Sequence, residues 1–459
     1  MVQPLTFSVR RSRLILIFLF VLSLPAVTTR IYASDEVEAF VWLHSLAFDH
    51  DVSFQNEYQY FYDSGQVKNP AFHETFLERT TEIGRRVNFT TLGAAVLWAP
   101  FYAAGHVAAP LVGAPADGLS RPYIAAAAIG SACYGFLAVL LSAAIATRVA
   151  GVGTMAALAV WIGTPLFFYM YVTPLFAHAC SAFAVALFLW TWLRVREHWS
   201  PRGALLLGLT GALMTLVRSQ DAFFIAGPVL DFVRTASISR RAALVKPALA
   251  GALAFVAAYA PQLLAYYALN GHPGPSVYES RKMSWSSPHG WQVVFDAQHG
   301  LFAWTPLALV AVVGLIGLAA ARTNRPSAST PSPRWIAVCA LVMFVLQAYI
   351  AGAVESWTVA GAFGQRRFVS VTPLLVVGLA CWLAAGARRV RAVRWAAVAV
   401  IVIGVWWNVG LMAQFGLHTM DRERVDLRAN ARRTFVELPI QLPSLVWRYL
   451  TNRASFYGQ

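Results

Sequence analysis

The chain has 459 residues, of which 58% are hydrophobic and only 12% are charged. Soluble domains carry about 25% charged residues, so this composition excludes an ordinary soluble protein and indicates one that is embedded in a membrane. A formal net charge of +15 could indicate nucleic-acid binding. The excess basic residues lie in short loops between apolar segments, however, as orientation signals do. We therefore expect a membrane as partner and no nucleic acid.

Continuous apolar runs rich in Ala, Leu and Val predict transmembrane helices, because about 20 such residues cross the hydrocarbon core as a helix. Strands of a membrane barrel would instead alternate in hydropathy over about ten residues. We predict an all-α polytopic membrane protein with about eleven transmembrane helices. The predicted spans are 14–26, 123–147, 153–171, 175–193, 203–217, 222–233, 248–269, 301–321, 335–354, 368–385 and 395–415.

The run 14–26 follows Arg10, Arg11 and Arg13. It is interpreted as the first span, with a cleaved signal peptide as the alternative. In both cases the chain emerges on the far side of the membrane near Ser34.

The segment 89–112 is apolar but is interrupted by Pro100 and Pro110. If it does not cross, the loops on the N-terminal side hold half of the 36 basic residues and only two acids, and the other side holds 19 of the 21 acids. The positive-inside rule is then obeyed at every turn, whereas a crossing would invert every later loop. We therefore predict a re-entrant or surface helix at 89–112, an N-terminus in the cytoplasm and a C-terminus outside.

This topology gives a transmembrane domain at 1–415 and an extracytoplasmic tail at 416–459. Within the domain, 32–112 forms a long first extracytoplasmic loop that carries surface helices. Its part 32–86 holds ten of the 21 acids. The apolar positions between Asp35 and Phe48 predict an amphipathic helix that lies on the membrane surface, with Ser34 as its N-cap.

The acids of the first loop are the first candidate site residues. Asp35 and Glu36 either stay solvated at a helix N-terminus or act as carboxylates that accept a proton from an incoming hydroxyl or amine. Asp49, Asp51 and Glu57 are further candidates for binding substrate or a metal ion, although two acids spaced by two residues are a weak metal signal.

Other polar residues interrupt apolar sequence, and the predicted topology brings them to the same extracytoplasmic side. Arg218 and Asp221 separate the short spans 203–217 and 222–233. Because an arginine inside the membrane is costly, Arg218 either pairs with Asp221 or faces a water-filled cavity. The polar stretch 278–282, YESRK, reaches this side as well.

Two lone histidines and one basic cluster complete the candidates. His178 and His299 are interpreted as packing residues or as substrate contacts. Gln365, Arg366 and Arg367 lie at the outer end of a span. The two arginines there either reach lipid phosphates or hold the phosphate of a lipid-linked substrate, for which a guanidinium fork is suited.

The order of one span, an outer loop that opens with Asp35-Glu36, and then many spans resembles the GT-C superfamily of membrane glycosyltransferases. The chain is most similar to the protein O-mannosyltransferase and aminoarabinose-transferase-like proteins of bacteria. At residue level the resemblance rests on the first loop, on PLFAH at 174–178, on LVRSQD at 216–221 and on FGQRRF at 363–368.

Members of this superfamily transfer a sugar with inversion from a polyprenyl-phosphate-linked donor on the extracytoplasmic face. The resemblance implies that Asp35 activates the acceptor, that Glu36 supports it, and that Arg366 and Arg367 hold the lipid phosphate. His178 stands where many members have an acid. This departure leaves open both a second acidic contact to the acceptor and a divalent metal as cofactor.

The sequence thus predicts an inverting glycosyltransferase in the plasma (inner) membrane of a bacterium, with its site facing the periplasm or the outside. Its partners would be a polyprenyl-phosphate sugar lipid and an acceptor lipid, glycan or protein. One alternative is a transporter or flippase of lipid-linked saccharides, which would favour internal repeats and polar groups near mid-membrane. The other is a non-catalytic membrane partner in cell-envelope glycan assembly, which would tolerate loss of Asp35.

Overall fold

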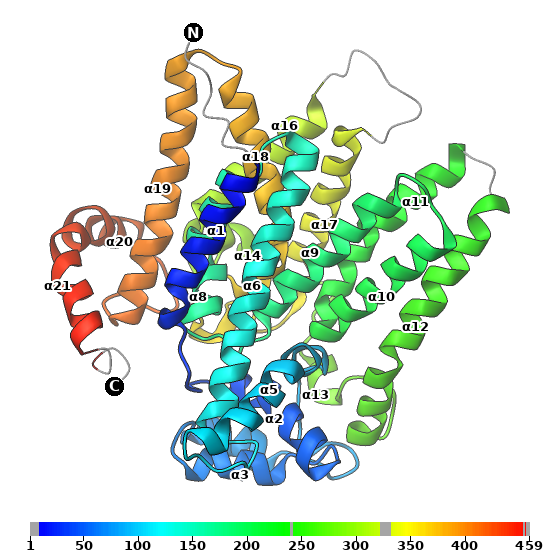
Figure 1. Ribbon diagram of the computed structural model, residues 1–459, viewed down its shortest axis with the longest axis vertical. Helices are drawn as coiled ribbons and strands as arrows, with labels where there is room; N and C mark the ends of the chain where they lie inside the picture. Colours follow the sequence, from blue (N-terminus) through cyan, green and yellow to red (C-terminus); the bar gives the residue numbers. More distant parts are fainter. Residues whose placement is uncertain (1–8, 239–241, 322–331, 453–454, 456–459) are drawn as a thin grey trace.

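A computed structural model of the protein describes residues 9–238, 242–321, 332–452 and 455, and its regular elements are helices (Figure 1). Within these residues the only β-pairing consists of two isolated bridges, Thr80 with Arg86 and Met283 with Val354. The predicted all-helical class is therefore confirmed. The predicted tail, 416–459, is described to residue 452 and at 455.

The first half of the chain contains α1 (Val9–Ser23), α2 (Ser34–His44), α3 (Gln55–Asp63), α4 (Pro70–Phe72), α5 (Gly93–Leu111), α6 (Arg121–Ala150), α7 (Thr154–Ile162), α8 (Pro165–Tyr171), α9 (His178–Val195), α10 (Pro201–Val217) and α11 (Ala226–Ile238). The second half contains α12 (Ala242–Asn270), α13 (Val277–Arg281), α14 (Gln292–Phe295), α15 (Leu301–Trp304), α16 (Pro306–Ala320), α17 (Pro333–Ala353), α18 (Thr372–Ala387), α19 (Arg391–Gly416), α20 (Leu427–Arg432) and α21 (Leu438–Thr451). Short 3-10 or π turns join them at η1 (Leu24–Ala26), η2 (Ser45–Asp49), η3 (His73–Glu78), η4 (Ser219–Ile225), η5 (Val359–Gly361), η6 (Arg366–Val371) and η7 (Arg433–Glu437).

Seven helices in the described residues are long and apolar enough to cross a membrane. The pair α7 and α8, bent by 68° at their junction, makes eight if the pair is one span. Three shorter apolar helices, Arg13–Ala26, Pro201–Val217 and Pro306–Ala320, match predicted spans but fall short of a full span in length. The chain is thus a multi-pass helical membrane protein, and the predicted count of eleven spans is not confirmed.

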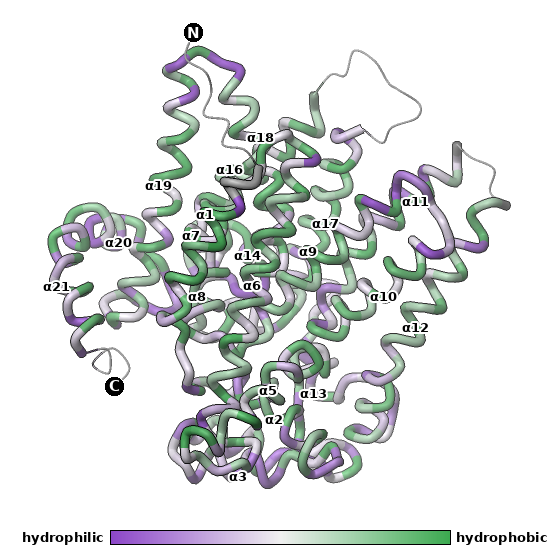
Figure 2. The backbone as a smooth tube through the Cα atoms, viewed as in Figure 1, coloured by the Kyte–Doolittle hydropathy of each residue, from purple (hydrophilic) through white to green (hydrophobic). Residues whose placement is uncertain are grey.

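The helices of the first loop, α2 to α5, gather at the end of the molecule away from the start of α1 (Figure 1). We call residues 34–111 the first-loop assembly. Hydrophilic residues are frequent there, whereas hydrophobic residues predominate along the long helices (Figure 2). This separation is typical of a membrane bundle with a polar cap on one side.

Helix α5 belongs to this assembly by its packing. The 30 residues of α6 extend about 45 Å, which exceeds the hydrocarbon thickness of about 30 Å. Helix α5 packs against the first part of α6, where Gly105 lies against Pro122 and Tyr123 and the indole N–H of Trp98 donates to Ser131 Oγ (2.8 Å). This packing favours a surface location for 89–112, although α5 alone has the length and hydropathy of a span.

Helix α2 forms where a helix was predicted, but it is buried rather than amphipathic. Ala33 is the N-cap and Ser34 is already the first helical residue. Every residue from Glu36 to His44 is buried, both glutamates of the helix included. The prediction of a surface helix with a solvated polar face is therefore wrong, because α3 and α5 pack around α2.

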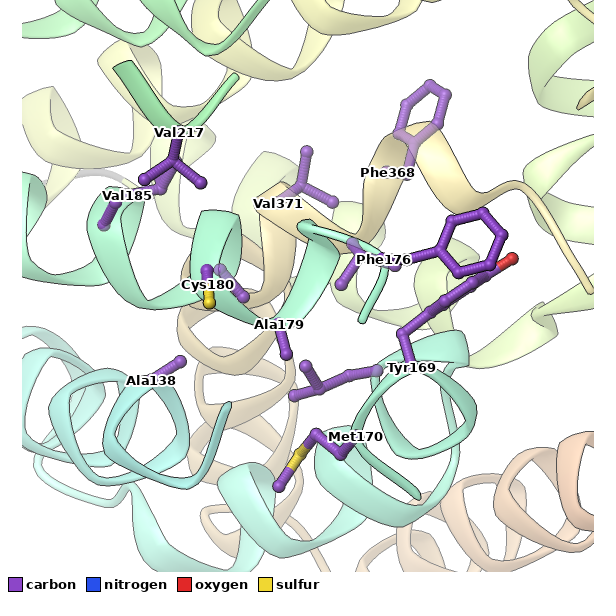
Figure 3. Close-up of a cluster of buried hydrophobic side chains, with 14 of the residues drawn as sticks. Ala138, Tyr169, Met170, Phe176, Ala179, Cys180, Val185, Val217, Phe368 and Val371 are labelled. Atoms are coloured by element: carbon purple, nitrogen blue, oxygen red, sulfur yellow. The ribbon is translucent and has the colours of Figure 1, made fainter. Parts of the chain in front are cut away.

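A continuous apolar core joins the membrane helices next to the N-terminal end of α9 and the C-terminal end of α10. Figure 3 shows part of this core, where Met170 of α8, Cys180 of α9 and Val371 of η6 converge on one cluster. A side chain larger than hydrogen at Gly135 of α6 would collide with Met170. Such close packing fixes the positions of α9 and η6, and both elements carry candidate site residues.

Candidate functional site

A cavity of about 600 Å³ lies between the N-terminal turn of α2, the N-terminal end of α9, the C-terminal end of α10 and the start of η6. Seven of its lining residues carry titratable side chains: Asp35, His178, Arg218, Glu279, Lys282, Arg366 and Arg367. Four of these are arginine or lysine and two are carboxylic acids. The cavity therefore has an excess of positive charge and suits an anionic ligand.

Asp35 and Arg366 form an ion pair in this cavity although 331 residues separate them in sequence. Arg366 Nη1 donates to Asp35 Oδ2 at 2.7 Å. The Asp35 side chain is 45% exposed and the Arg366 side chain 17%. The guanidinium also lies over the ring of Phe176, 5.2 Å from its centroid, which is a favourable cation–π arrangement. The carboxylate can thus be reached from the cavity, while the cation is held from behind.

Arg218 ends α10 in an extended conformation and turns its side chain toward α9. Its Nη1 lies 2.5 Å from His178 Nδ1 and its Nη2 donates to Gln220 Oε1 (3.1 Å). Because a guanidinium only donates, His178 Nδ1 must accept, which leaves the proton of a neutral ring on Nε2. Arg218 therefore faces the cavity. This was one of the two alternatives predicted for it, the other being a pair with Asp221.

Asp221, the other predicted partner of Arg218, lies away from the cavity. It is fully buried and accepts from Ser181 Oγ at 2.5 Å. No ion pair joins it to Arg218 in the described residues. Asp221 therefore ties η4 to α9 beneath the site.

Arg367 lines the cavity and also holds a neighbouring loop. Its guanidinium donates to the backbone carbonyl and to Oγ of Ser356, at 2.7 and 3.1 Å. Its backbone carbonyl accepts from Gln220 Nε2 (3.2 Å) and Gln347 Nε2 (2.8 Å). The backbone at the start of η6 is thus fixed by α17 and η4 together.

Gln365 and His299 lie behind the cavity rather than in it, and both are fully buried. Gln365 Nε2 donates to the carbonyls of His299 (3.1 Å) and Trp357 (3.0 Å). The His299 ring stacks on Trp304 with centroids 4.6 Å apart, and burial lowers its pKa to about 4. Both residues join the loops that present Arg366, so their contacts are structural.

Glu36 is also buried and lies outside the cavity. Its Oε2 accepts from the backbone N–H groups of Tyr32 (2.9 Å) and Ala33 (3.2 Å). Burial raises its pKa to about 8. The side chain caps the first turn of α2 and supports Asp35 from behind, while only Asp35 of the predicted catalytic pair reaches the cavity.

The remaining predicted acids, Asp49, Asp51 and Glu57, lie near the other end of α2. Asp49 and Glu57 face His44, which is about 13 Å along the helix from Asp35 at about 1.5 Å per residue. Asp51 accepts from Ser45 Oγ (3.0 Å) in the intervening turn. The structure therefore does not bring these three acids to the cavity.

Two further residues of the site were not among the predicted ones, although the stretch that carries them was noted as polar. Glu279 and Lys282 of YESRK also line the cavity. Lys282 Nζ lies over the ring of Phe89, 4.4 Å from its centroid. Burial raises the pKa of Glu279 to about 7. The signal for them was a charged stretch shortly after the span that ends at Asn270.

Glu38 was not predicted either, and it does not itself line the cavity. Its Oε1 accepts from the backbone N–H of Phe89 (2.8 Å), and its own carbonyl accepts from Asn88 Nδ2 (3.0 Å). Burial and the charge of Asp35 raise its pKa to about 8. Since Asp35 and Glu38 lie one helical turn apart on one face, Glu38 holds the wall segment 88–90 beside the candidate base.

No protein-family model matches this sequence, and no curated protein matches it either. The likeness to GT-C glycosyltransferases therefore rests on the residues quoted for it, and the function rests on the chemistry of the cavity.

Proposed function

We propose that the chain is an inverting glycosyltransferase that moves a sugar from a polyprenyl-phosphate-linked donor to an acceptor on the extracytoplasmic face of a bacterial inner membrane. One observation carries this proposal. A reachable carboxylate, Asp35, lies in the same cavity as Arg218, Arg366 and Arg367. An acid beside a cluster of arginines provides both a base for an acceptor and a cradle for a leaving phosphate.

The arginines suit a phosphate better than a neutral ligand. A guanidinium fork donates two parallel hydrogen bonds to phosphate oxygens, and such charge-assisted bonds are roughly twice as strong as neutral ones. Arg218 and Arg366 present such forks to one cavity, and Phe89, Phe223 and Ile350 provide apolar wall. Because the cavity lies at the ends of α9, α10 and α17, a lipid in the bilayer can bring its phosphate there.

Asp35 is the candidate base. Without donor it is paired with Arg366. A donor phosphate would compete for the same guanidinium, and Asp35 would then be free to accept a proton. Binding of the donor would thus prepare the base, and a base within hydrogen-bond reach of the acceptor typically contributes about 10²–10⁴-fold to the rate.

The proposed step balances without any other reactant. The acceptor oxygen or nitrogen attacks the anomeric carbon from the face opposite the phosphate, and its proton passes to Asp35. The bond between that carbon and the phosphate oxygen breaks, and the oxygen leaves with the electron pair. The arginines stabilise the charge that develops on the leaving phosphate.

The test is sugar release from a panel of radiolabelled polyprenyl-phosphate sugars, using purified full-length protein in lipid. We expect Asp35→Asn to lower turnover by at least about 100-fold while donor binding persists. Arg366→Lys keeps the charge but loses the fork, so we expect the KM for donor to rise by roughly tenfold.

The matched control is Asp63→Asn. Asp63 is an exposed acid of the same loop, and its carboxylate accepts a hydrogen bond from Gln59 Nε2, so this variant should turn over like the wild type. Equal turnover of wild type and Asp35→Asn would refute the role of Asp35. Movement of labelled lipid across the bilayer without sugar release would instead favour the flippase alternative.

A further inference from the structure

A second cluster of polar side chains lies in the first-loop assembly, away from the cavity. It consists of His44 at the end of α2, Asp49 in η2 and Glu57 in the first turn of α3. His44 Nδ1 lies 3.0 Å from Glu57 Oε1 and 3.3 Å from Asp49 Oδ2. Among the described residues this is the one group of three or more such side chains whose ligand atoms all lie close enough to share a metal ion.

The His44 ring is held so that Nδ1 faces the two carboxylates. The ring stacks on Phe48 with an interplanar angle of 4° and centroids 5.2 Å apart. Its hydrogen bond to the backbone of Asp117 falls to Nε2, because Nδ1 is directed at the acids. Metal-binding histidines almost always fix their second nitrogen in this way, on a carbonyl or a carboxylate.

The backbone of Gly118 packs closely against the ring. A Cβ at Gly118, where φ is +76°, would come within 2.7 Å of His44 Cδ2 and of the Phe48 ring. Glycine at this position therefore lets the 117–118 backbone approach the imidazole closely. This contact and the stacking on Phe48 restrain the ring with Nδ1 toward the two acids.

The environment of the two carboxylates is a second, independent indication that the cluster binds a cation. Glu57 is completely buried, and its Oε2 has no hydrogen-bond partner. Asp49 is partly exposed, with Asn56 Nδ2 donating to its Oδ2 at 2.7 Å. A buried carboxylate with an unpartnered oxygen is unfavourable unless a cation compensates it. A cation bound between the acids and His44 would satisfy that oxygen, which the imidazole contact alone does not.

The distances fit a transition-metal site. Two ligand atoms that each lie about 2.1 Å from one ion are about 3.0 Å apart at an octahedral angle and about 3.4 Å apart at a tetrahedral angle. The two distances from His44 Nδ1 to the carboxylates fall in this range. One imidazole with two carboxylates is a nitrogen and oxygen ligand set, which suits Zn²⁺ or Mn²⁺ rather than a soft ion that requires thiolate.

We propose that His44, Asp49 and Glu57 bind a divalent transition-metal ion, of the Zn²⁺ or Mn²⁺ class, that joins the end of α2 to α3. The site lies about one helix length from Asp35 and includes no residue of the cavity. The inference therefore does not depend on glycosyl transfer. By fixing one end of α2, the ion would stabilise the helix whose other end carries Asp35.

The test uses the full chain, purified in detergent, stripped with a chelator and titrated with Zn²⁺ or Mn²⁺ alone. We expect one ion to bind per chain and the thermal unfolding midpoint to rise with metal concentration, since a ligand of the folded state stabilises it by mass action. Glu57→Gln and Asp49→Asn should each weaken binding by at least about tenfold.

Asp51→Asn is the matched control. Asp51 lies two residues from Asp49, but its carboxylate accepts from Ser45 and Ser53, so metal binding should be unchanged. Asp49 is partly exposed, so Asp49→Asn should fold even if loss of the buried Glu57 carboxylate prevents folding. Absence of stoichiometric metal in the wild type, or equal binding by Asp49→Asn and Asp51→Asn, would overturn the proposal in favour of a protonated His44 between two acids.

Discussion

Two buried glutamates, Glu36 and Glu38, follow Asp35 closely in α2. Glu36 caps the first turn and Glu38 holds the segment that starts at Phe89. Burial raises the pKa of each to about 8. In the folded protein both groups therefore keep their protons at pH values where they would have lost them in the unfolded chain.

This difference predicts a pH dependence of stability. Between pH 4.5 and about 8 the folded state binds more protons than the unfolded state, so the free energy of unfolding falls as the pH rises through this window. The stabilisation is complete below the unfolded pKa and is lost above the folded one. We expect the thermal unfolding midpoint to fall between pH 5 and pH 8.5 and the fall to be smaller in Glu38→Gln, because glutamine carries no proton to lose.

The control for this measurement is Asp63→Asn, which removes an exposed carboxylate from the same loop. Its unfolding midpoint should follow the wild-type pH profile. A Glu38→Gln profile as steep as that of the wild type would show that Glu38 is already ionised in the folded protein.

At the scale of single residues, the sequence predicted which polar residues come together better than it predicted the orientation of their side chains. Loop charge and hydropathy brought Asp35, His178 and Arg366 to one side, and all three line the cavity. Hydropathy could not distinguish Asp35 from Glu36, because neighbouring helical residues point about 100° apart and packing partners far along the chain decide which one is buried.

At the scale of elements, the contact between α16 and α18 shows how the membrane helices support the site. The backbones approach so closely that a Cβ at Gly314 would collide with the carbonyl of Gly378, and one at Gly378 would collide with that of Ala311. Small residues allow such approach between membrane helices. Because η6 leads directly into α18, this contact also determines where Arg366 lies.

We expect Gly314→Ala to force α16 and α18 apart and to destabilise the protein by about 1–3 kcal/mol, as overpacking typically does. The measurement is the thermal unfolding midpoint in detergent, which should fall by several degrees. Gly317→Ala is the matched control, since Gly317 lies on the same helix with nothing within 4 Å of its added Cβ. Equal midpoints for the two variants would contradict the close contact.

Periodicity and apolar length predicted where helices form, but they did not predict which neighbouring elements pack against each helix and bury its side chains. The helix after Ser34 forms as expected, yet Glu36 and Glu38 are buried in it. Its acids suggested a solvated face, and the helices α3 and α5 that cover it were not foreseeable from that segment alone. The predicted span 153–171 is instead the bent pair α7 and α8, and here the signal is local: Gly163 is the C-cap of α7, and Thr164 caps α8 with Pro165 in its first turn.

At the scale of the whole molecule, the topology predicted for the loops depends on whether α5 crosses the membrane. The helix has the length and hydropathy of a span, but it packs against the outer part of α6 and lies in the first-loop assembly (Figure 1). If α5 crossed once, the loops before and after it would lie on opposite sides, whereas the cavity joins Asp35, which precedes α5, with His178 and Arg366, which follow it. Loop charge favours the other arrangement.

Cysteine labelling in intact cells tests this arrangement with three variants, Ser64→Cys before α5, Ala116→Cys after it and His198→Cys between α9 and α10, all at exposed positions. If α5 stays on one side, a membrane-impermeant maleimide should label positions 64 and 116 in intact cells, and position 198 only after permeabilisation. The native cysteines are buried or half-buried in the helices, so the wild type provides the background. Labelling of position 64 without position 116 would show that α5 crosses, and every loop after it would then change sides relative to the first loop.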